Sequence, residues 1–454
     1  MLSFVSNFFA RACRIVLVAS ALWSAAAPAN AQSGAPLLDP AAADTLRGAL
    51  GGAFVERRFP LALTSGARCE LRLWLQRDHV QHAERIADAA REALDQYGAW
   101  FSPYPYDQLT IVDVPWRSPE EDRRIPGVVT IRARWLQPER SLTLEAQVAG
   151  GIARQWWGTL VAMPDRYLAD GLAQYAQSRT LERIFDRRHQ RINYSLLETR
   201  WFGGLVPWAI RAARLDRQTN GINRAAFRRL PGVDLQDASA SSRPAQAAKS
   251  AAAIITLERY LGWPALQRGL SAAARRYAGQ TMTAAMFVET LGDATDRDLS
   301  WFADPAFAPA STYDYAVAGL TSVADETGAC GTGPCYRTTV VLRRLGEAVF
   351  SGTSLPPVGP YESGRALEVE VRFADGQRSD DHWDGRADEK TLVYHGPAPA
   401  TWARIDPART LLLDINRLNN ARTLTPPSPA ATLPWSVRWT TWLQDLLLSS
   451  AFFF

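Results

Sequence analysis

Five histidines are the first candidates for metal binding or proton transfer in this sequence. His79 and His82 stand three residues apart and close to Glu84, a spacing that can present two ligands from one helix face. The same residues open a helical pattern, so we expect a solvated helix start rather than a replacement metal site. The other histidines fall on a charged helical face or in a strand-like region, where we expect surface positions: His189, His382 and His395. No serine stands in a GxSxG nucleophile elbow.

The cysteines predict a local disulfide and no metal site. Cys330 and Cys335 flank a Gly-Pro turn in "TGACGTGPCYR", so we expect them to pair with each other. Cys13 lies in an N-terminal leader, and Cys69 is then expected to be free and buried. A CxxC redox motif is absent, and no cysteine pair has the spacing of a zinc site.

An unusual helical stretch, "EAQVAGGIARQWWGTLVAMPDRYLADGLAQY", covers residues 145–175. Its apolar residues recur every four positions, which predicts a helix: Val148, Ile152, Trp156 and Leu160. Gly150 and Gly151 nevertheless sit in the middle, and each costs a helix interior about 1 kcal/mol relative to alanine. Tertiary packing must therefore fix this helix, and the glycines either leave a small void or admit another segment.

The elements around this stretch follow from hydrophobic periodicity. Alternating patterns predict strands, and longer periodic patterns predict helices, which dominate from about 142 to 302. The expected strands are 67–76, the second part of 103–116, and 127–135; the expected helices include 82–101, 247–262, 263–279 and 283–302. After residue 307 the pattern changes to short alternating runs with Gly and Pro turns, typical of a β-sandwich: "YRTTVVLRR", "RALEVEVRF", "ARIDP" and "TLLLDI".

Residues 148–175 carry a specific resemblance. "VAGGIARQWWG" and "ADGLAQY" resemble the active-site helices of the membrane alanyl aminopeptidase family, which are zinc metallopeptidases of the gluzincin group. That family has HExxH followed by QWFG or QWWG, and then NEGFAEY. "WFSPYPYDQLTIVDVPW" and the helical segments up to "DLSWFADPAF" resemble further parts of the family, in the same order, over roughly residues 60–308. The resemblance implies a thermolysin-like metallopeptidase domain.

The residues that do the family's chemistry are replaced here. By the resemblance, the two histidine ligands fall on Gly150 and Arg154, and the catalytic glutamate falls on Gly151. The glutamate ligand falls on Asp170, with three fewer intervening residues than the family pattern, and the tyrosine of YxKG falls on Ala247. Zinc needs about three protein ligands, and glycine offers none. We therefore predict that the zinc expected of the family is absent and that no catalytic residue remains.

Arg154 and Asp170 are the candidate binding residues that remain. We hypothesise that Arg154 occupies the former zinc position and pairs with Asp170, because a buried arginine requires a partner. The alternative is that Arg154 extends into solvent in an open cleft. The Gly-x-Met-Glu-Asn motif that grips a peptide amino terminus is missing, and its expected place in 117–127 offers only Glu120 and Glu121 as candidate binding groups.

The chain ends suggest export and a membrane surface. Arg11 and Arg14 precede an apolar run, 15–27, which is typical of a signal peptide cleaved after Ala31; the alternative is a short membrane anchor. The C-terminal "WSVRWTTWLQDLLLSSAFFF" places tryptophans and leucines on one helix face, so residues 435–454 either lie on a membrane surface, pack on the protein or a partner, or span the membrane. The net charge of +4 comes from arginines interspersed with acids, which does not predict nucleic-acid binding.

These observations together predict an α+β protein: a thermolysin-like metallopeptidase domain with a degenerate site, followed by a C-terminal β-sandwich-like domain. The expected divisions are a signal peptide (1–31), a lead-in (32–54), the aminopeptidase-like domain (55–308), the β-sandwich-like domain (309–424) and a linker with a Trp-rich tail (425–454). We expect a periplasmic or outer-face inner-membrane pseudoenzyme that binds a peptide or protein in the former cleft or acts as an envelope scaffold. Two alternatives stay open: an active peptidase with non-standard residues, or a structural, membrane-associated envelope protein.

Overall fold

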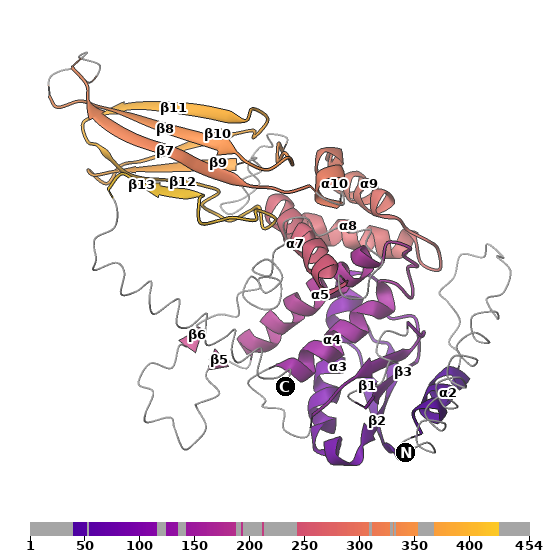
Figure 1. Ribbon diagram of the computed structural model, residues 1–454. Coiled ribbons are helices and arrows are strands. Elements are labelled where there is room, and N and C mark those ends of the chain that lie inside the picture. The colour runs from indigo at the N-terminus through magenta and orange to yellow at the C-terminus, as the bar shows by residue number, and fades with distance from the viewer. Residues whose placement is uncertain are drawn as a thin grey trace, which may run out of the picture.

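The computed structural model describes most of the chain between residues 40 and 425 and shows a mixed α+β protein (Figure 1). The described residues are 40–51, 54–115, 124–134, 142–187, 192–193, 211–212, 243–307, 311–326, 330, 333–352 and 367–425. The expected signal peptide, Glu120 and Glu121, His189 and the Trp-rich tail therefore lie outside the described residues. Within the described part, no helix is long and apolar enough to cross a bilayer.

The first layer is a four-stranded sheet in the order β1-β2-β3-β4, which leaves β4 at its edge. β1 runs antiparallel to β2, whereas β2, β3 and β4 are parallel. Its strands are β1 (Phe54–Ala62), β2 (Arg68–Gln76), β3 (Gln108–Asp113) and β4 (Val128–Ile131). The 3-10 helix η1 (Arg77–His82) and helix α3 (Ala83–Trp100) connect β2 to β3, as a parallel pair requires.

Helices form the second layer. They are α4 (Thr143–Trp156), α5 (Arg166–Arg187), α7 (Arg243–Leu261), α8 (Trp263–Arg276), α9 (Ala284–Thr295) and α10 (Ser300–Phe307). α5 and α7 pack so closely that a Cβ at Gly171 would overlap the Ser250 side chain. The alanine-rich sequence of α7 suits this contact, because small side chains allow two helix backbones to approach. Two short strands, β5 (Ile192–Asn193) and β6 (Arg211–Ala212), pair between α5 and α7 in the sequence.

The C-terminal part consists of two antiparallel sheets, in the orders β10-β9-β12-β13 and β11-β8-β7. Their strands are β7 (Tyr315–Ala324), β8 (Tyr336–Arg344), β9 (Leu367–Phe373), β10 (Arg378–Trp383), β11 (Glu389–Gly396), β12 (Ala400–Ile405) and β13 (Ala421–Thr423). Alternate residues of β8 and β9 are fully buried, as Val340, Leu342, Val369 and Val371 show. The alternation read from the sequence therefore marks the inner faces of these strands.

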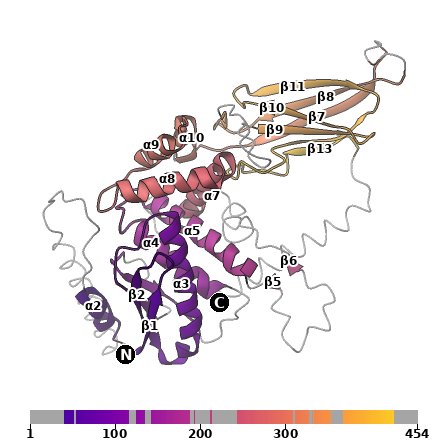
Figure 2. The same ribbon diagram turned by 180° about the vertical axis from the view of Figure 1, so that it is seen from behind.

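An aromatic cluster joins the C-terminal sheets to the helices. Phe350 lies 5.1 Å from Trp301 and 6.0 Å from Tyr260 between ring centroids. Leu412 N also donates a hydrogen bond of 3.1 Å to Thr256 Oγ1 of α7. Figures 1 and 2 both place the C-terminal sheets beyond α7 and α10, at the opposite end from the β1–β4 sheet. One continuous core therefore connects the two parts.

Three sequence expectations about elements need correction. The lead-in 32–54 contains a helix, α2 (Pro40–Leu50), because Leu46 packs on the sheet and the Arg47 guanidinium lies over the Trp74 ring. The helical pattern 283–302 is two helices, since Asp296 adopts a left-handed conformation (φ 53°) that ends α9. "TLLLDI" (410–415) is not a strand, because its first amides bind the Asp406 carboxylate instead of a neighbouring strand.

Candidate functional site

Helix α4 carries the motif that the sequence singled out. Val148, Ile152 and Trp156 are all fully buried, so the period-four pattern is the core face of α4. Trp156 Nε1 donates to the Ser102 carbonyl oxygen at 2.9 Å, which fixes the end of the helix. The buried face of α4 and its C-terminal end are therefore held in place.

A second face of α4 lies against the edge of β4 that pairs with no described strand. It is formed by Gln147, Gly151 and Gln155, four residues apart. Gln147 receives a hydrogen bond from Arg132 N (2.7 Å) and donates to Arg132 O (3.1 Å). Gln155 in the same way receives one from Gly127 N (2.8 Å) and donates to Val128 O (2.9 Å). The two carboxamides thus provide hydrogen-bond partners for backbone N–H and C=O groups in and beside an edge strand.

Gly151 is the point of closest approach between α4 and β4. A Cβ there would overlap Val129 Cγ1, so any residue other than glycine requires Val129 to shift. A Cβ at Gly150 would lie 3.2 Å from Gln177 Oε1, at the end of a flexible side chain. The sequence left open whether the glycines leave a void or admit another segment, and at Gly151 they admit β4. Neighbouring side chains occupy the space where the family's histidine and glutamate would begin.

Asp170 lies among arginines. Arg124 Nη2 donates to Asp170 Oδ1 at 3.0 Å, and Arg154 Nε lies 3.6 Å from the same oxygen. The pair hypothesised from the sequence is thus an ion pair, and Arg124 makes the hydrogen bond. The Arg154 side chain is 46% exposed, whereas those of Arg124 and Asp170 are 16% and 22% exposed. Arg154 therefore combines the two alternatives, because it reaches Asp170 and still faces solvent.

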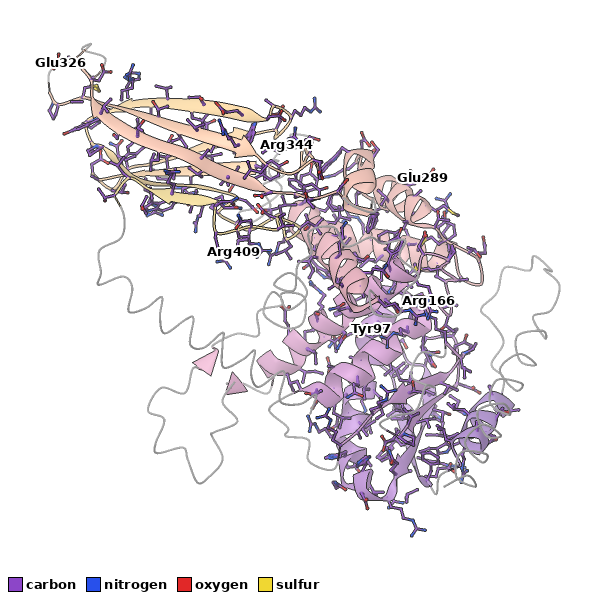
Figure 3. The ribbon with its side chains drawn as sticks, viewed as in Figure 1. Tyr97, Arg166, Glu289, Glu326, Arg344 and Arg409 are labelled. Atoms are coloured by element: carbon purple, nitrogen blue, oxygen red, sulfur yellow. A yellow bond between two sulfur atoms is a disulfide. The ribbon has the colours of Figure 1, made fainter. Side chains whose placement is uncertain are left out.

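Sequence reasoning missed Arg124, which the structure places against Gly158. Gly158 has φ 104°, a conformation that favours glycine, and a Cβ there would overlap the Arg124 guanidinium. Burial lowers the pKa of Arg124, and the nearby charges of Arg166 and Arg154 lower it further, while Asp170 opposes this shift. Arg166 is the first residue of α5 and is exposed; Figure 3 labels it at the margin of the helical layer.

The other residues of the degenerate motif form packing contacts. Ala247 is buried in α7, and its methyl group cannot stabilise an oxyanion. Tyr175, the last residue of "ADGLAQY", donates to Glu258 Oε2 at 2.6 Å, and Arg179 also pairs with Glu258. These buried groups tie α5 to α7. Glu120 and Glu121, the other candidate binding residues, lie outside the described residues.

His79 and His82 interact with different partners. His79 Nδ1 lies 2.6 Å from Asp113 Oδ2, and His82 Nε2 lies 2.9 Å from the Arg134 carbonyl oxygen. His79 is only 13% exposed, so the expectation of a solvated helix start is wrong for it: it fastens η1 to β3. The two side chains thus point to different partners, one on β3 and one after β4.

One cluster in the described part of the chain has metal-binding residue types: Asp325, Cys335 and His395. His395 Nδ1 lies 2.7 Å from Asp325 Oδ2, and His395 is 40% exposed. Cys335, however, forms the disulfide with Cys330 that the sequence predicted, so it offers no thiolate. Cys69 is free and buried, also as predicted. Burial raises the pKa of Cys69 to about 12, so its thiol is unreactive at neutral pH.

Comparison with known proteins shows similarity in fold only. No family model matches the chain, and no curated protein matches it. Among solved structures, the chain is similar to aminopeptidase A of Legionella pneumophila in complex with aspartic acid, with a TM-score of 0.51 and 12% identity. The match covers 80% of this chain and 38% of that one, so the chain spans well under half of its length. At this identity the likeness supports a peptidase-like fold.

Proposed function

We propose that this chain is an exported, catalytically inactive relative of the zinc aminopeptidases that binds a peptide or protein partner. Its first part would be a thermolysin-like domain and its last part a β-sandwich-like domain. The peptidase-like fold and the motif order in residues 148–175 support this descent. The residues at the active-site positions support the loss of catalysis.

The observation that carries the proposal is the set of residues Gly150, Gly151, Arg154 and Asp170. A catalytic zinc takes three protein ligands and keeps one position for water. Here Asp170 is the single side chain of a ligand type among those four, and its Oδ1 already interacts with two arginines. Arginine is always charged and is not a ligand. These residues therefore do not fit a zinc ion, and no hydrolytic step follows from them.

A second observation argues against simple restoration of the zinc site. Val129 occupies the space into which a side chain at residue 151 would extend, and Gln177 lies beside residue 150. A glutamate at 151 would require the Val129 side chain to shift. This close packing supports the proposal that the chain has a non-catalytic role.

Hydrolysis of fluorogenic aminoacyl amides by the purified mature protein tests the proposal. The assay would be run with added zinc and with a chelator, beside a zinc aminopeptidase as the positive control. We expect no hydrolysis above the chelator-treated background. Chelator-sensitive turnover that purifies with the chain would contradict the proposal and favour the alternative of an active peptidase with non-standard residues.

A further inference from the structure

Two arginines contact the Asp170 carboxylate, and a third arginine lies near one of them. Arg124 and Arg154 both interact with Asp170 Oδ1, at 3.0 Å and 3.6 Å. Arg166 lies one helical turn before Asp170 on α5, so the two residues share a helix face. The charges of Arg154 and Arg166 also act on Arg124. We call Arg124, Arg154 and Arg166 the arginine cluster.

The arginine cluster has more positive charge than its partner can balance. Among the described residues, Asp170 is the one acid within ion-pair distance of any of the three guanidinium groups. Among the residues that the structure describes, three cations near one anion leave an excess of two positive charges. Like charges held together cost free energy, and an added anion would relieve this cost.

The cluster is also accessible and preorganised. Arg154 is 46% exposed and Arg166 is exposed, so both can reach a ligand. Arg124 is only 16% exposed and packs over Gly158, which fixes its position. Arg166 begins the 22-residue helix α5, whose N-terminal end adds a partial positive charge. A rigid arginine beneath two exposed ones is a suitable arrangement for gripping a planar anion.

We propose that the arginine cluster binds a carboxylate of the peptide ligand, either a chain-terminal carboxylate or an Asp or Glu side chain. This inference rests on the proposed function, because that proposal supplies a peptide as the ligand. A guanidinium group matches a carboxylate with two parallel hydrogen bonds. A metal ion at this position would polarise a peptide carbonyl, whereas fixed cations without a nucleophile hold an anion and release it unchanged.

Calorimetric titration of the full mature chain with N-acetylated tetra-alanine peptides tests the inference. One pair of peptides differs only in a free or an amidated C-terminus, and a second, amidated pair differs only in one Asp or Asn. We expect saturable binding of the free-carboxylate or the Asp peptide, and binding about tenfold weaker for its neutral twin. The pair that shows the difference identifies the source of the carboxylate. Equal binding within both pairs, or no saturable binding, would overturn the inference.

Arg154→Gln and Arg276→Gln form a matched pair of variants. Each arginine is about half exposed and pairs with one aspartate, Arg154 with Asp170 at 3.6 Å and Arg276 with Asp293 at 3.4 Å. Arg154→Gln should weaken binding of the carboxylate peptide about tenfold, whereas Arg276→Gln should leave it unchanged. Equal effects would mean that general surface charge, and not the cluster, attracts the peptide.

Asp170→Asn should change peptide affinity in the opposite direction to Arg154→Gln. Removal of the internal carboxylate leaves the three arginines unbalanced, so we expect about threefold tighter binding of the carboxylate peptide, with Asp293→Asn as the neutral control. Weaker binding in a folded Asp170→Asn protein would contradict the inference. These outcomes are independent of hydrolysis: an inactive chain that ignores carboxylates overturns only the inference, and a turnover-competent chain overturns the proposed function.

Discussion

At the scale of single residues, Gly150 and Gly151 look alike in the sequence but differ in the structure. We predict that Gly151→Ala lowers the free energy of unfolding by about 2 kcal/mol, because its Cβ would overlap Val129 Cγ1. Gly150→Ala should change stability by less than about 1 kcal/mol, because Gln177 can move aside and alanine favours a helix. Chemical denaturation of both variants measures the difference.

The double variant Gly151→Ala/Val129→Ala controls for this cause. Removal of the Val129 methyl groups should recover part of the loss, so the two substitutions should show a favourable coupling. If Gly150→Ala were the more damaging change, or if the coupling were zero, the close approach of α4 and β4 would not be what requires glycine.

Asp414 gives a prediction about pH. Burial raises its pKa from 3.8 to about 6, although the amide of Asn420 donates to its carboxylate. Between pH 3.8 and about pH 6, Asp414 keeps its proton in the folded state but loses it in the unfolded state. The free energy of unfolding therefore falls as the pH rises through this range and stays low above it. The stability of the wild type relative to Asp414→Asn should therefore fall by about 2 kcal/mol between pH 4 and pH 7.

Urea denaturation at several pH values measures this difference. Asp388→Asn is the control, because the Asp388 carboxylate is 86% exposed. A relative stability of the Asp414→Asn protein that does not change with pH would show that Asp414 titrates alike in the folded and unfolded states.

The sequence revealed the residues of the degenerate site but not their surroundings. Asp170 and Arg154 were paired correctly, since helical spacing and the motif resemblance place both near one site. Arg124 was missed, because it lies 30 residues before Arg154 in a segment without a recognisable motif. The contact of Gly151 with Val129 joins a helix to a strand, and periodicity alone does not reveal which strand meets a helix.

At the scale of elements, α4 closes the free edge of β4. Gln155 receives a hydrogen bond from Gly127 N and donates to Val128 O, at 2.8 Å and 2.9 Å. We predict that Gln155→Leu, which keeps the side-chain size, destabilises the protein by about 3 kcal/mol, because buried backbone groups lose their partner. Thermal and urea denaturation measure the change.

Gln267→Leu is the matched control on α8. Gln267 also donates one side-chain hydrogen bond, to the Ala99 carbonyl oxygen at 3.2 Å, but this bond is exposed. Its loss should cost less than about 0.5 kcal/mol. Equal effects of the two leucine substitutions would mean that α4 does not seal the β4 edge.

Several elements were predictable because their patterns are strong and local. The strand of 67–76 and the helices of 247–262 and 263–279 correspond closely to β2, α7 and α8. The division of 283–302 into two helices could not be predicted, because Asp296 ends α9 through a left-handed backbone conformation that aspartate adopts only occasionally. α2 was missed because alanine-rich composition fits a loose segment as well as a helix, and its contact with Trp74 is long-range.

At the scale of the whole molecule, the aromatic cluster around Phe350 couples the helices to the C-terminal sheets. Phe350 is fully buried and contacts rings from both parts. We predict that Phe350→Ala costs about 4 kcal/mol, as loss of a large buried aromatic side chain does. Scanning calorimetry should show one transition for the wild type and a lower midpoint for the variant.

Leu345→Ala is the control, because Leu345 is 58% exposed and should contribute little. Two separate transitions in the wild type, with only one of them affected by Phe350→Ala, would show that the two parts fold independently. The sequence predicted the change of texture near residue 307, but it gave no sign of this contact, because the aromatic residues come from distant segments.

The proposed function requires that packing contacts and the arginine cluster stand in this peptidase-like fold where a zinc aminopeptidase would have its metal ligands. Elemental analysis of zinc in the purified mature protein, after incubation with zinc and removal of the excess, tests it most directly. We predict far less than one zinc per chain, since Gly150, Gly151 and Arg154 offer no ligand. About one tightly bound zinc per chain would contradict the account.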